Sequence, residues 1–222
     1  MTDVKNVAPE MGLFLTVEGV EGVGKTTNIT FISEWLKERE IPFIHTREPG
    51  GTPLAEELRE LLLAPRDESV APTAELLMMF AARAQHIEQV IKPALDAGKW
   101  VLCDRFTDAT YAYQGGGREM GFDKIQQLEQ FVQGEFRPDA VVLLDLPVAV
   151  GLARAAKRGA LDRFEQEAEG FFQRVRAAYL DRAKENPGRY WLVDAEKSLG
   201  EVQTQISSVL ESIMLAKVSA KR

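Results

Sequence analysis

A glycine-rich segment between an apolar run and a helical pattern is the feature that most constrains the fold of this chain. Residues 19–26, GVEGVGKT, match the phosphate-binding pattern G-x-x-x-x-G-K-[ST]. The run LFLTV at residues 13–17 predicts a strand before it, and a helix is predicted from Lys25. Glycines let successive backbone N–H groups turn toward phosphate oxygens, and the helix N-terminus attracts anions. The segment therefore predicts a phosphate-binding loop, or P-loop, at a strand-to-helix junction.

This loop implies a set of nucleotide contacts. Lys25 can reach the β and γ phosphates of a nucleoside triphosphate, and the Thr26 hydroxyl can ligate Mg²⁺. A glycine-rich turn that matches by chance is the alternative, but the strand and helix around the segment favour a nucleotide site. We expect ATP to contact Gly19, Val20, Glu21, Gly22, Val23, Gly24, Lys25, Thr26 and Thr27.

Short β-rich runs alternate with helical patterns, which is typical of a parallel sheet covered by helices on both faces. Strands are predicted at residues 13–18, 42–46, 100–104, 141–146 and 190–194. Helices are predicted near residues 25–40, 53–63, 73–97, 123–134, 148–157, 165–186 and 199–217. Pro93 should kink or interrupt the third of these helices. The predicted fold class is α/β, a three-layer P-loop fold with a five-stranded parallel sheet flanked by helices.

Composition narrows the class of protein. The net charge of −7 argues against a protein that binds nucleic acid, whereas a small anionic substrate needs only a local basic pocket. Cys103 is the one cysteine, which excludes an internal disulfide, and we expect it to be a small core residue. The first twelve residues lack the apolar core of a signal peptide, and no stretch is suited to span a bilayer. We therefore expect a cytoplasmic protein without membrane contacts.

Charged residues follow the predicted strands at the edge where ligands bind in open parallel sheets. Arg47 lies at the end of the second strand, and Arg105 follows Asp104 at the end of the third. An arginine fork suits the oxygens of a phosphate, although a structural ion pair is the alternative for either arginine. Asp104 could orient metal-bound water or Arg105, and Glu18 and Glu21 lie near the loop.

Three further segments accompany the P-loop: TREPGG (46–51), FAARAQ (80–85) and CDRFTDATYAYQGGGR (103–118). With this order and spacing, from about Leu13 to Leu210, the chain resembles the bacterial thymidylate kinase family. The resemblance implies transfer of the γ-phosphoryl group of ATP to dTMP, giving dTDP and ADP for dTTP synthesis, with Mg²⁺, in a homodimer. A GTPase would carry an N-K-x-D-like stretch, which is absent. Another nucleoside monophosphate kinase and a non-catalytic nucleotide-binding module remain as alternatives.

The resemblance also implies where dTMP binds. The positions of Arg47 and Arg105 hold its phosphate, the position of Glu21 lies close to the acceptor sugar, and that of Tyr113 lies against the deoxyribose. A core tyrosine is the alternative for Tyr113. The triple glycine at residues 115–117 is expected to form a flexible loop of hinges. The metal environment is assigned to Thr26, Glu18 and Asp104.

Thymine presents two carbonyl acceptors and an N3–H donor, which a cationic donor plus a hydroxyl or an amide can satisfy. Arg83, Thr110 and Gln114 are expected to read this edge, although a surface charge is the alternative for Arg83. The family usually places an aromatic residue four positions before this arginine to stack on the base. That position is Met79 here, and Phe80 follows it, so either Met79 or Phe80 packs against the ring.

The segment LARAAKRGALDRFEQE, residues 152–167, carries several basic side chains around a glycine. It is either a solvated face or a short lid that closes over ATP. Because the P-loop has no arginine at residues 20–23, the resemblance to the bacterial form implies that the lid supplies one. Arg158 is the first choice and Arg163 the second, both as ATP contacts, and Ala156 stands where relatives often have an arginine.

Lys25, Arg105 and Arg158 are therefore the expected catalytic residues. We expect a single domain over residues 1–222, with flexible ends at 1–11 and 217–222.

Overall fold

The computed structural model of the chain describes residues 12–156, 163–164 and 167–219. The strands are β1 (Phe14–Glu18), β2 (Phe43–Arg47), β3 (Trp100–Asp104), β4 (Ala140–Asp145) and β5 (Tyr190–Asp194). The helices are α1 (Lys25–Glu38), α2 (Pro53–Leu63), α3 (Pro72–His86), α4 (Lys92–Asp96), α5 (Thr107–Thr110), α6 (Phe122–Gln133), α7 (Val148–Ala155), α8 (Glu169–Glu185) and α9 (Leu199–Ser219). Two segments, η1 (Ile87–Ile91) and η2 (Tyr111–Gly117), have π-helical hydrogen bonding.

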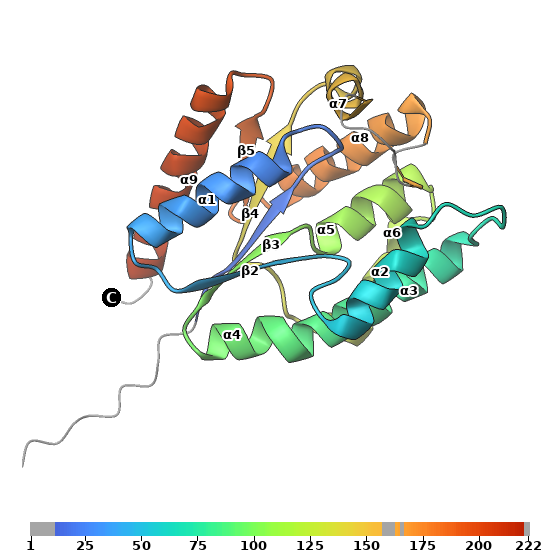
Figure 1. Ribbon diagram of the computed structural model, residues 1–222, viewed down its shortest axis with the longest axis horizontal. Coiled ribbons are helices and arrows are strands. Elements are labelled where there is room, and N and C mark those ends of the chain that lie inside the picture. Colours follow the sequence, from blue (N-terminus) through green and yellow to red (C-terminus); the bar gives the residue numbers. More distant parts are fainter. Residues whose placement is uncertain (1–11, 157–162, 165–166, 220–222) are drawn as a thin grey trace, which may run out of the picture.

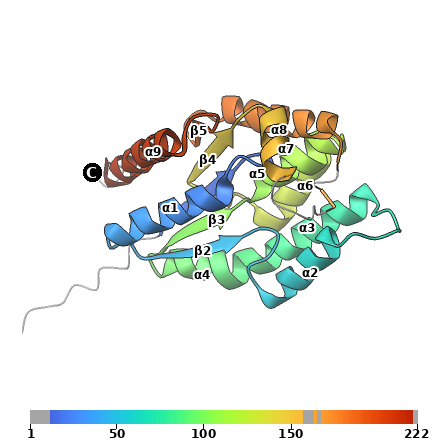
Figure 2. The ribbon, with the colours of Figure 1, turned by 45° about the horizontal axis from the view of Figure 1, so that its top comes forward.

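All five strands are parallel and lie in the order β2-β3-β1-β4-β5, which confirms the predicted α/β fold. Helices α1 and α9 pack on one face of the sheet, and η1, α4 and α8 pack on the other (Figures 1 and 2). The carboxyl ends of the central strands lie level, because Asp104 pairs with Arg47 of β2 and with Val17 of β1. The residues that end these strands therefore meet at one edge of the sheet.

Alternate side chains of β1 enter different parts of the core, as expected for a strand covered on both faces. Leu15 and Val17 pack in a cluster that includes Ile32 of α1. Phe14 packs on the opposite side, in a cluster with Ile87 and Cys103. The prediction that Cys103 is a core residue is confirmed, and burial raises the pKa of its thiol well above the ordinary value. None of the helices in the described ranges combines the length and apolar character that crossing a bilayer requires.

The predicted third helix is interrupted near Pro93, as expected. The interruption is a change from α-helical to π-helical hydrogen bonding, and the chain stays helical through it. Helix α3 runs directly into the π-helical turn η1, and α4 follows. Pro93 has no N–H to donate to the carbonyl of Gln89, and the wider turn lies just before it. Helix α9 continues to Ser219, beyond the predicted end at Lys217. The remaining ends expected to be flexible, residues 1–11 and 220–222, lie outside the described residues.

The prediction of a flexible loop at Gly115–Gly117 is wrong. These residues form the end of η2 and pack against the helix α8 and the start of α6. A Cβ on Gly115 would lie 2.6 Å from the Phe122 ring, and one on Gly117 would lie 2.4 Å from the Phe171 ring. The glycines are present because neighbouring side chains fill the space of a Cβ, so they hold α8 close to the site and do not act as hinges.

Candidate active site

The P-loop has the conformation that its glycines predict. Gly24 precedes α1 with φ of +87°, a left-handed conformation that disfavours other residues. Gly22, with φ of +73°, lies so close to α7 that a Cβ would meet the Gly151 carbonyl oxygen at 1.9 Å. The Lys25 ammonium donates to the carbonyls of Gly19 and Val20 at 3.2 and 3.3 Å. Burial and the neighbouring Arg105 lower the pKa of Lys25. The loop is thus preformed around the lysine that is expected to meet phosphate.

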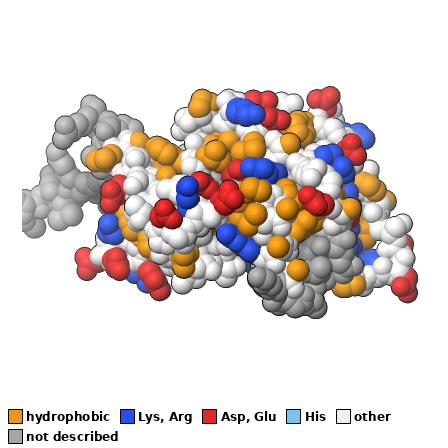
Figure 3. All heavy atoms as spheres, turned by 90° about the horizontal axis from the view of Figure 1, so that it is seen from above, with side chains coloured by type: hydrophobic (Ala, Val, Ile, Leu, Met, Phe, Trp, Pro, Cys, Tyr) orange, Lys and Arg blue, Asp and Glu red, His pale blue; other side chains and the backbone are white. Residues whose placement is uncertain are grey.

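A cavity of about 600 Å³ opens from the P-loop and extends toward α3 and η2. Most predicted site residues line it: Glu21, Gly22, Gly24, Lys25, Thr26, Thr27, Arg47, Met79, Arg83, Asp104, Arg105, Thr110, Tyr113 and Gln114. Val20 and Val23 instead point into the core. On the face viewed in Figure 3, basic side chains are interspersed with acidic ones. The cavity itself is lined by six basic and three acidic side chains, so it is locally basic in a chain whose net charge is −7.

Arg105 lines the cavity and has a strained backbone conformation, with φ of +68°. Its Nη2 donates to the Glu21 carboxylate at 2.7 Å, and its Nη1 donates to the Tyr179 hydroxyl at 3.0 Å. Its guanidinium carbon lies 4.8 Å from the centre of the Tyr113 ring. The Tyr113 hydroxyl also donates to Glu21, at 2.8 Å. Contacts with three elements therefore fix this arginine over the P-loop residue Glu21.

Two further arginines lie beside it. Arg47 pairs with Glu56 of α2 at 2.8 Å, and its side chain is 53% exposed, so the ion pair weighed as an alternative is present. Arg59, also from α2, lines the cavity and donates to the Pro49 carbonyl at 2.8 Å. Burial and the charge of Arg47 lower the pKa of Arg59. Sequence reasoning missed Arg59, because an arginine in an amphipathic helix resembles a solvated face residue.

The residues assigned to a metal ion differ in how they face the cavity. Thr26 and Asp104 both line it, and Oδ1 of Asp104 is buried without a hydrogen-bond partner. The Glu18 carboxylate instead accepts from the Phe106 backbone N–H at 2.6 Å and from the Tyr179 hydroxyl at 2.8 Å. Burial, followed by the charge of a nearby aspartate, raises the pKa of Glu18 to about 8. Thr26 and Asp104 therefore fit a magnesium ion better than Glu18 does.

Among the described residues no group of three acidic, histidine or cysteine side chains could hold a metal ion. Magnesium ions bound with nucleotides commonly use one or two protein oxygens together with phosphate oxygens and water. The pair Thr26 and Asp104 suits that kind of site.

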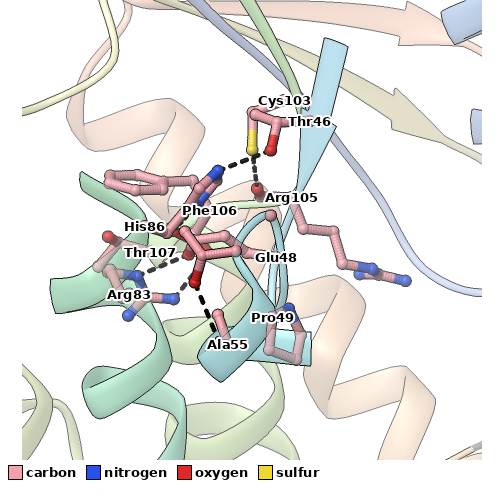
Figure 4. A network of polar contacts seen from close by, with 12 residues as sticks. Thr46, Glu48, Pro49, Ala55, Arg83, His86, Cys103, Arg105, Phe106 and Thr107 are labelled. Atoms are coloured by element: carbon pink, nitrogen blue, oxygen red, sulfur yellow. Dashed lines mark hydrogen bonds and ion pairs between the residues drawn. The ribbon is translucent and has the colours of Figure 1, made fainter. Parts of the chain in front are cut away.

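Arg83 is a buried residue, not a surface charge, with only 3% of its side chain exposed. Its Nε donates to Glu48 at 2.8 Å, and its Nη2 donates to the Thr110 hydroxyl at 2.8 Å. Figure 4 shows Glu48 between Arg83 and His86, with the Arg105 side chain directed away from this cluster. Nη1 of Arg83 is buried without a partner, although Arg83 lines the cavity. Among the described residues, no protein group accepts a hydrogen bond from this nitrogen.

Gln114 lies beside Thr110 in the same wall of the cavity. Its Nε2 donates to Glu75, a fully buried residue of α3, at 2.8 Å. Met79 also lines the cavity, whereas Phe80 is buried in the core. The centre of the Phe80 ring lies 4.8 Å from the guanidinium carbon of Arg83. Of the two residues considered for packing on a base, Met79 is the one that faces the cavity.

The segment predicted as a lid, residues 152–167, is described only in part. Arg158 lies outside the described residues. Arg163 does not line the cavity: its Nη2 donates to Glu75 at 2.6 Å and its Nε donates to the Leu62 carbonyl at 2.9 Å. Arg154 of α7 and Phe164 do line the cavity. The choice of Arg163 as an ATP contact stays a prediction, and in this structure the side chain is engaged elsewhere.

Several cavity residues were not assigned from sequence: Glu48, Pro49, Arg59, Leu63, Phe106, Ala109, Arg154 and Phe164. Glu48 and Phe106 lie inside the segments singled out above, next to assigned arginines. Their roles come from contacts with α3 that the sequence does not reveal.

Comparisons with known proteins bear directly on this site. The family model for thymidylate kinase matches residues 17–206. Thymidylate kinase from Ectopseudomonas mendocina (strain ymp) is 60% identical over 205 residues, which are 92% of this chain and 98% of the relative. The enzyme of that name from Pseudomonas putida (strain GB-1) is 61% identical over 203 residues, 91% and 97% of the two chains. The crystal structure of thymidylate kinase from Ehrlichia chaffeensis matches with a TM-score of 0.72 and 33% identity, covering 90% of this chain and 99% of that chain.

The P-loop on a parallel sheet, opening into a cavity shared with buried polar groups, places the protein among the ATP-dependent nucleotide kinases. Relatives at about 60% identity cover more than nine tenths of the chain. Within that class, the chain belongs to the thymidylate kinase family.

Proposed function

We propose that this chain transfers the γ-phosphoryl group of ATP to dTMP, giving dTDP and ADP for dTTP synthesis. The observation that carries the proposal is a single cavity lined both by the P-loop and by Arg83, whose Nη1 donor has no partner in the described protein. We call Met79, Arg83, Thr110 and Gln114 the base side, and Lys25, Arg47, Arg59 and Arg105 the phosphate side. The base side suits a pyrimidine edge, and the phosphate side suits the anions.

The phosphate side neutralises charge during transfer. Lys25 exchanges its contacts with the carbonyls of Gly19 and Val20 for the β and γ phosphates of ATP. Arg105, Arg47 and Arg59 hold the dTMP phosphate. An oxygen of that phosphate attacks the γ phosphorus, a new P–O bond forms, and the bond to the bridging oxygen breaks as ADP leaves. The attacking phosphate is already ionised, so positioning matters more than a strong base.

Thr26 and Asp104 would hold Mg²⁺, which would supply positive charge to offset that of the phosphates. We assign Glu18 a different role, which is to orient Arg105. The Tyr179 hydroxyl links the two residues, because it donates to Glu18 and accepts from Arg105. The lid excludes water, because water would otherwise accept the phosphoryl group. We assign the arginine on the transferred group to Arg158, and a second nucleotide contact to Arg154, which lines the cavity.

We extend the proposal to a single-domain, cytoplasmic homodimer that binds neither nucleic acid nor membrane. Exposed apolar side chains on three adjacent helices support self-association: Leu61 of α2, Leu77 of α3 and Phe131 of α6. Light scattering after size-exclusion chromatography tests this. A monomer at micromolar concentration would remove the dimer from the proposal.

A coupled assay with ATP, Mg²⁺ and a panel of nucleoside monophosphates tests the activity. We expect dTMP to be preferred over dCMP, dAMP and dGMP by kcat/KM, because a site built to bond one edge rejects edges that leave its groups unpaired. Preference for another monophosphate would reassign the substrate, and ATP hydrolysis without transfer would overturn the kinase proposal.

A further inference from the structure

Gln114 lines the cavity and donates to Glu75, which does not line the cavity. Glu75 is fully buried on α3, and Gln114 lies on η2, 39 residues further along the chain. The Glu75 carboxylate accepts hydrogen bonds from Nε2 of Gln114 at 2.8 Å, from Nη2 of Arg163 at 2.6 Å and from Nε of Arg118 at 3.5 Å. It is therefore an anion enclosed by donors from three segments.

This arrangement determines the orientation of the amide. A carboxylate flanked by two guanidinium groups accepts hydrogen bonds and donates none. The Gln114 amide can therefore bond the carboxylate only through its NH₂ group, and its Oε1 points away from Glu75. The described protein supplies no hydrogen bond to that oxygen, and Gln114 lines the cavity. The amide consequently offers the ligand an acceptor.

We propose that Glu75 is a positioning residue for base selection, which fixes Gln114 so that its Oε1 receives the N3–H of the acceptor nucleotide's pyrimidine. Thymine and uracil carry that hydrogen, whereas cytosine carries a lone pair at N3. A fixed acceptor facing N3 repels cytosine and bonds thymine, while Arg83 donates to a carbonyl of the base. The inference rests on the proposed function and adds a residue outside the cavity to it.

Arg163 gives the proposal a matched control. Its Nη2 donates to Glu75 at 2.6 Å and its guanidinium lies over the Phe164 ring, but it makes no hydrogen bond to Gln114 and does not itself line the cavity. Removing Arg163 takes one positive partner away from Glu75, but the carboxylate can still accept a hydrogen bond from Gln114. Replacing Glu75 by glutamine supplies an NH₂ group that can donate to Gln114, so that the Gln114 amide is free to turn over.

The experiment measures kcat/KM for dTMP and for dCMP in the wild type, Glu75→Gln, Arg163→Met and the double variant, with melting temperatures for all. We expect Glu75→Gln to lower the dTMP/dCMP ratio by about tenfold or more, and Arg163→Met to change it by less than about threefold. In a Gln114→Ala background, Glu75→Gln should not change the ratio further. A wild-type ratio in Glu75→Gln, or an equal fall in Arg163→Met, overturns the inference.

Two features keep the test decisive. If Glu75→Gln does not melt cooperatively, the double variant is compared with Arg163→Met alone, since removing both partners avoids an unpaired buried charge. The unmodified protein gives a second measurement: N3-methyl-dTMP should bind at least about a hundredfold more weakly than dTMP, and equal binding overturns the inference. Failure of the wild type to phosphorylate dTMP would instead refute the proposed function, so the two failures are distinguishable.

Discussion

The two sides of the cavity are built in different ways. On the base side, Arg83 is 3% exposed and Gln114 is buried, and each is held by a buried carboxylate, Glu48 or Glu75. On the phosphate side, Arg47 is 53% exposed and paired with Glu56, and Lys25 bonds two loop carbonyls. The base side is fixed before any ligand arrives. On the phosphate side Arg105 is also fixed, by Glu21 and Tyr179, whereas Arg47 and Lys25 bond partners that a phosphate can replace.

This difference follows from the ligand chemistry. A neutral base offers only hydrogen bonds, and these discriminate only if the protein groups are already oriented and would be left unpaired by a wrong base. A phosphate carries charge that attracts guanidinium and ammonium groups strongly enough to exchange their partners. The comparison predicts that the carboxylate partners Glu48 and Glu75 are essential on the base side, and that Glu56, the partner of Arg47 on the phosphate side, is dispensable.

The largest loss is expected for Lys25→Ala. Lys25 contributes charge to the transferred phosphates, so kcat should fall by about a thousandfold or more. Its two hydrogen bonds to carbonyls are small contributions to stability, and the melting temperature should stay close to that of the wild type. Steady-state kinetics and calorimetry check both. Lys37→Ala, an exposed position on the same helix, is the control, and near-normal turnover in Lys25→Ala would remove the P-loop assignment.

Arg158→Ala comes next. An arginine that contacts the phosphoryl group mainly in the transition state should lower kcat by roughly a hundredfold or more and change KM for dTMP little. Arg163→Ala is the comparison variant, because Arg163 bonds Glu75 and Leu62 in this structure. A larger kcat effect at Arg163 would transfer the role to it. Normal kcat in both variants and in the double variant would mean that the lid is only a solvated face.

Arg83→Met tests the base side by two readouts. It removes the donors that hold Glu48 and Thr110 and leaves a buried carboxylate without its arginine. We expect the free energy of unfolding to fall by about 3 kcal/mol and KM for dTMP to rise by about a hundredfold. Denaturant titration and kinetics measure the two effects. A variant as stable as the wild type with unchanged KM would show that Arg83 is neither a buried partner nor a base reader.

The smallest effects are expected on the phosphate side, and they have opposite signs. Arg47→Ala should raise KM for dTMP by about tenfold, because it removes one exposed phosphate donor among several. Glu56→Ala frees Arg47 from its ion pair, so KM should stay the same or fall. Initial-rate measurements over a range of dTMP concentrations distinguish these outcomes. If Glu56→Ala raises KM as much as Arg47→Ala, the ion pair positions the arginine, and the proposed contrast between the two sides fails.

The local chemistry of the chain was sufficient to predict the sheet, the P-loop and the residues that end the strands. Strand and helix periodicity depend on near neighbours in sequence, and the loop pattern includes its own conformational requirement through Gly22 and Gly24. Arg47 and Asp104 were placed correctly because parallel strands bring their carboxyl ends to one edge.

Tertiary structure alone decided what these side chains contact. Pairs such as Glu75 with Gln114 and with Arg163 join residues 39 and 88 positions apart, and nothing in the pattern of either segment specifies the other. The same holds for Gly115–Gly117. The sequence suggests that these glycines are hinges, but in the folded chain Phe122 and Phe171 pack tightly against them. Sequence pattern determines which chemistry is available at the site, whereas the burial of distant carboxylates and rings fixes the direction of each hydrogen bond, because only the folded chain brings those groups within bonding distance.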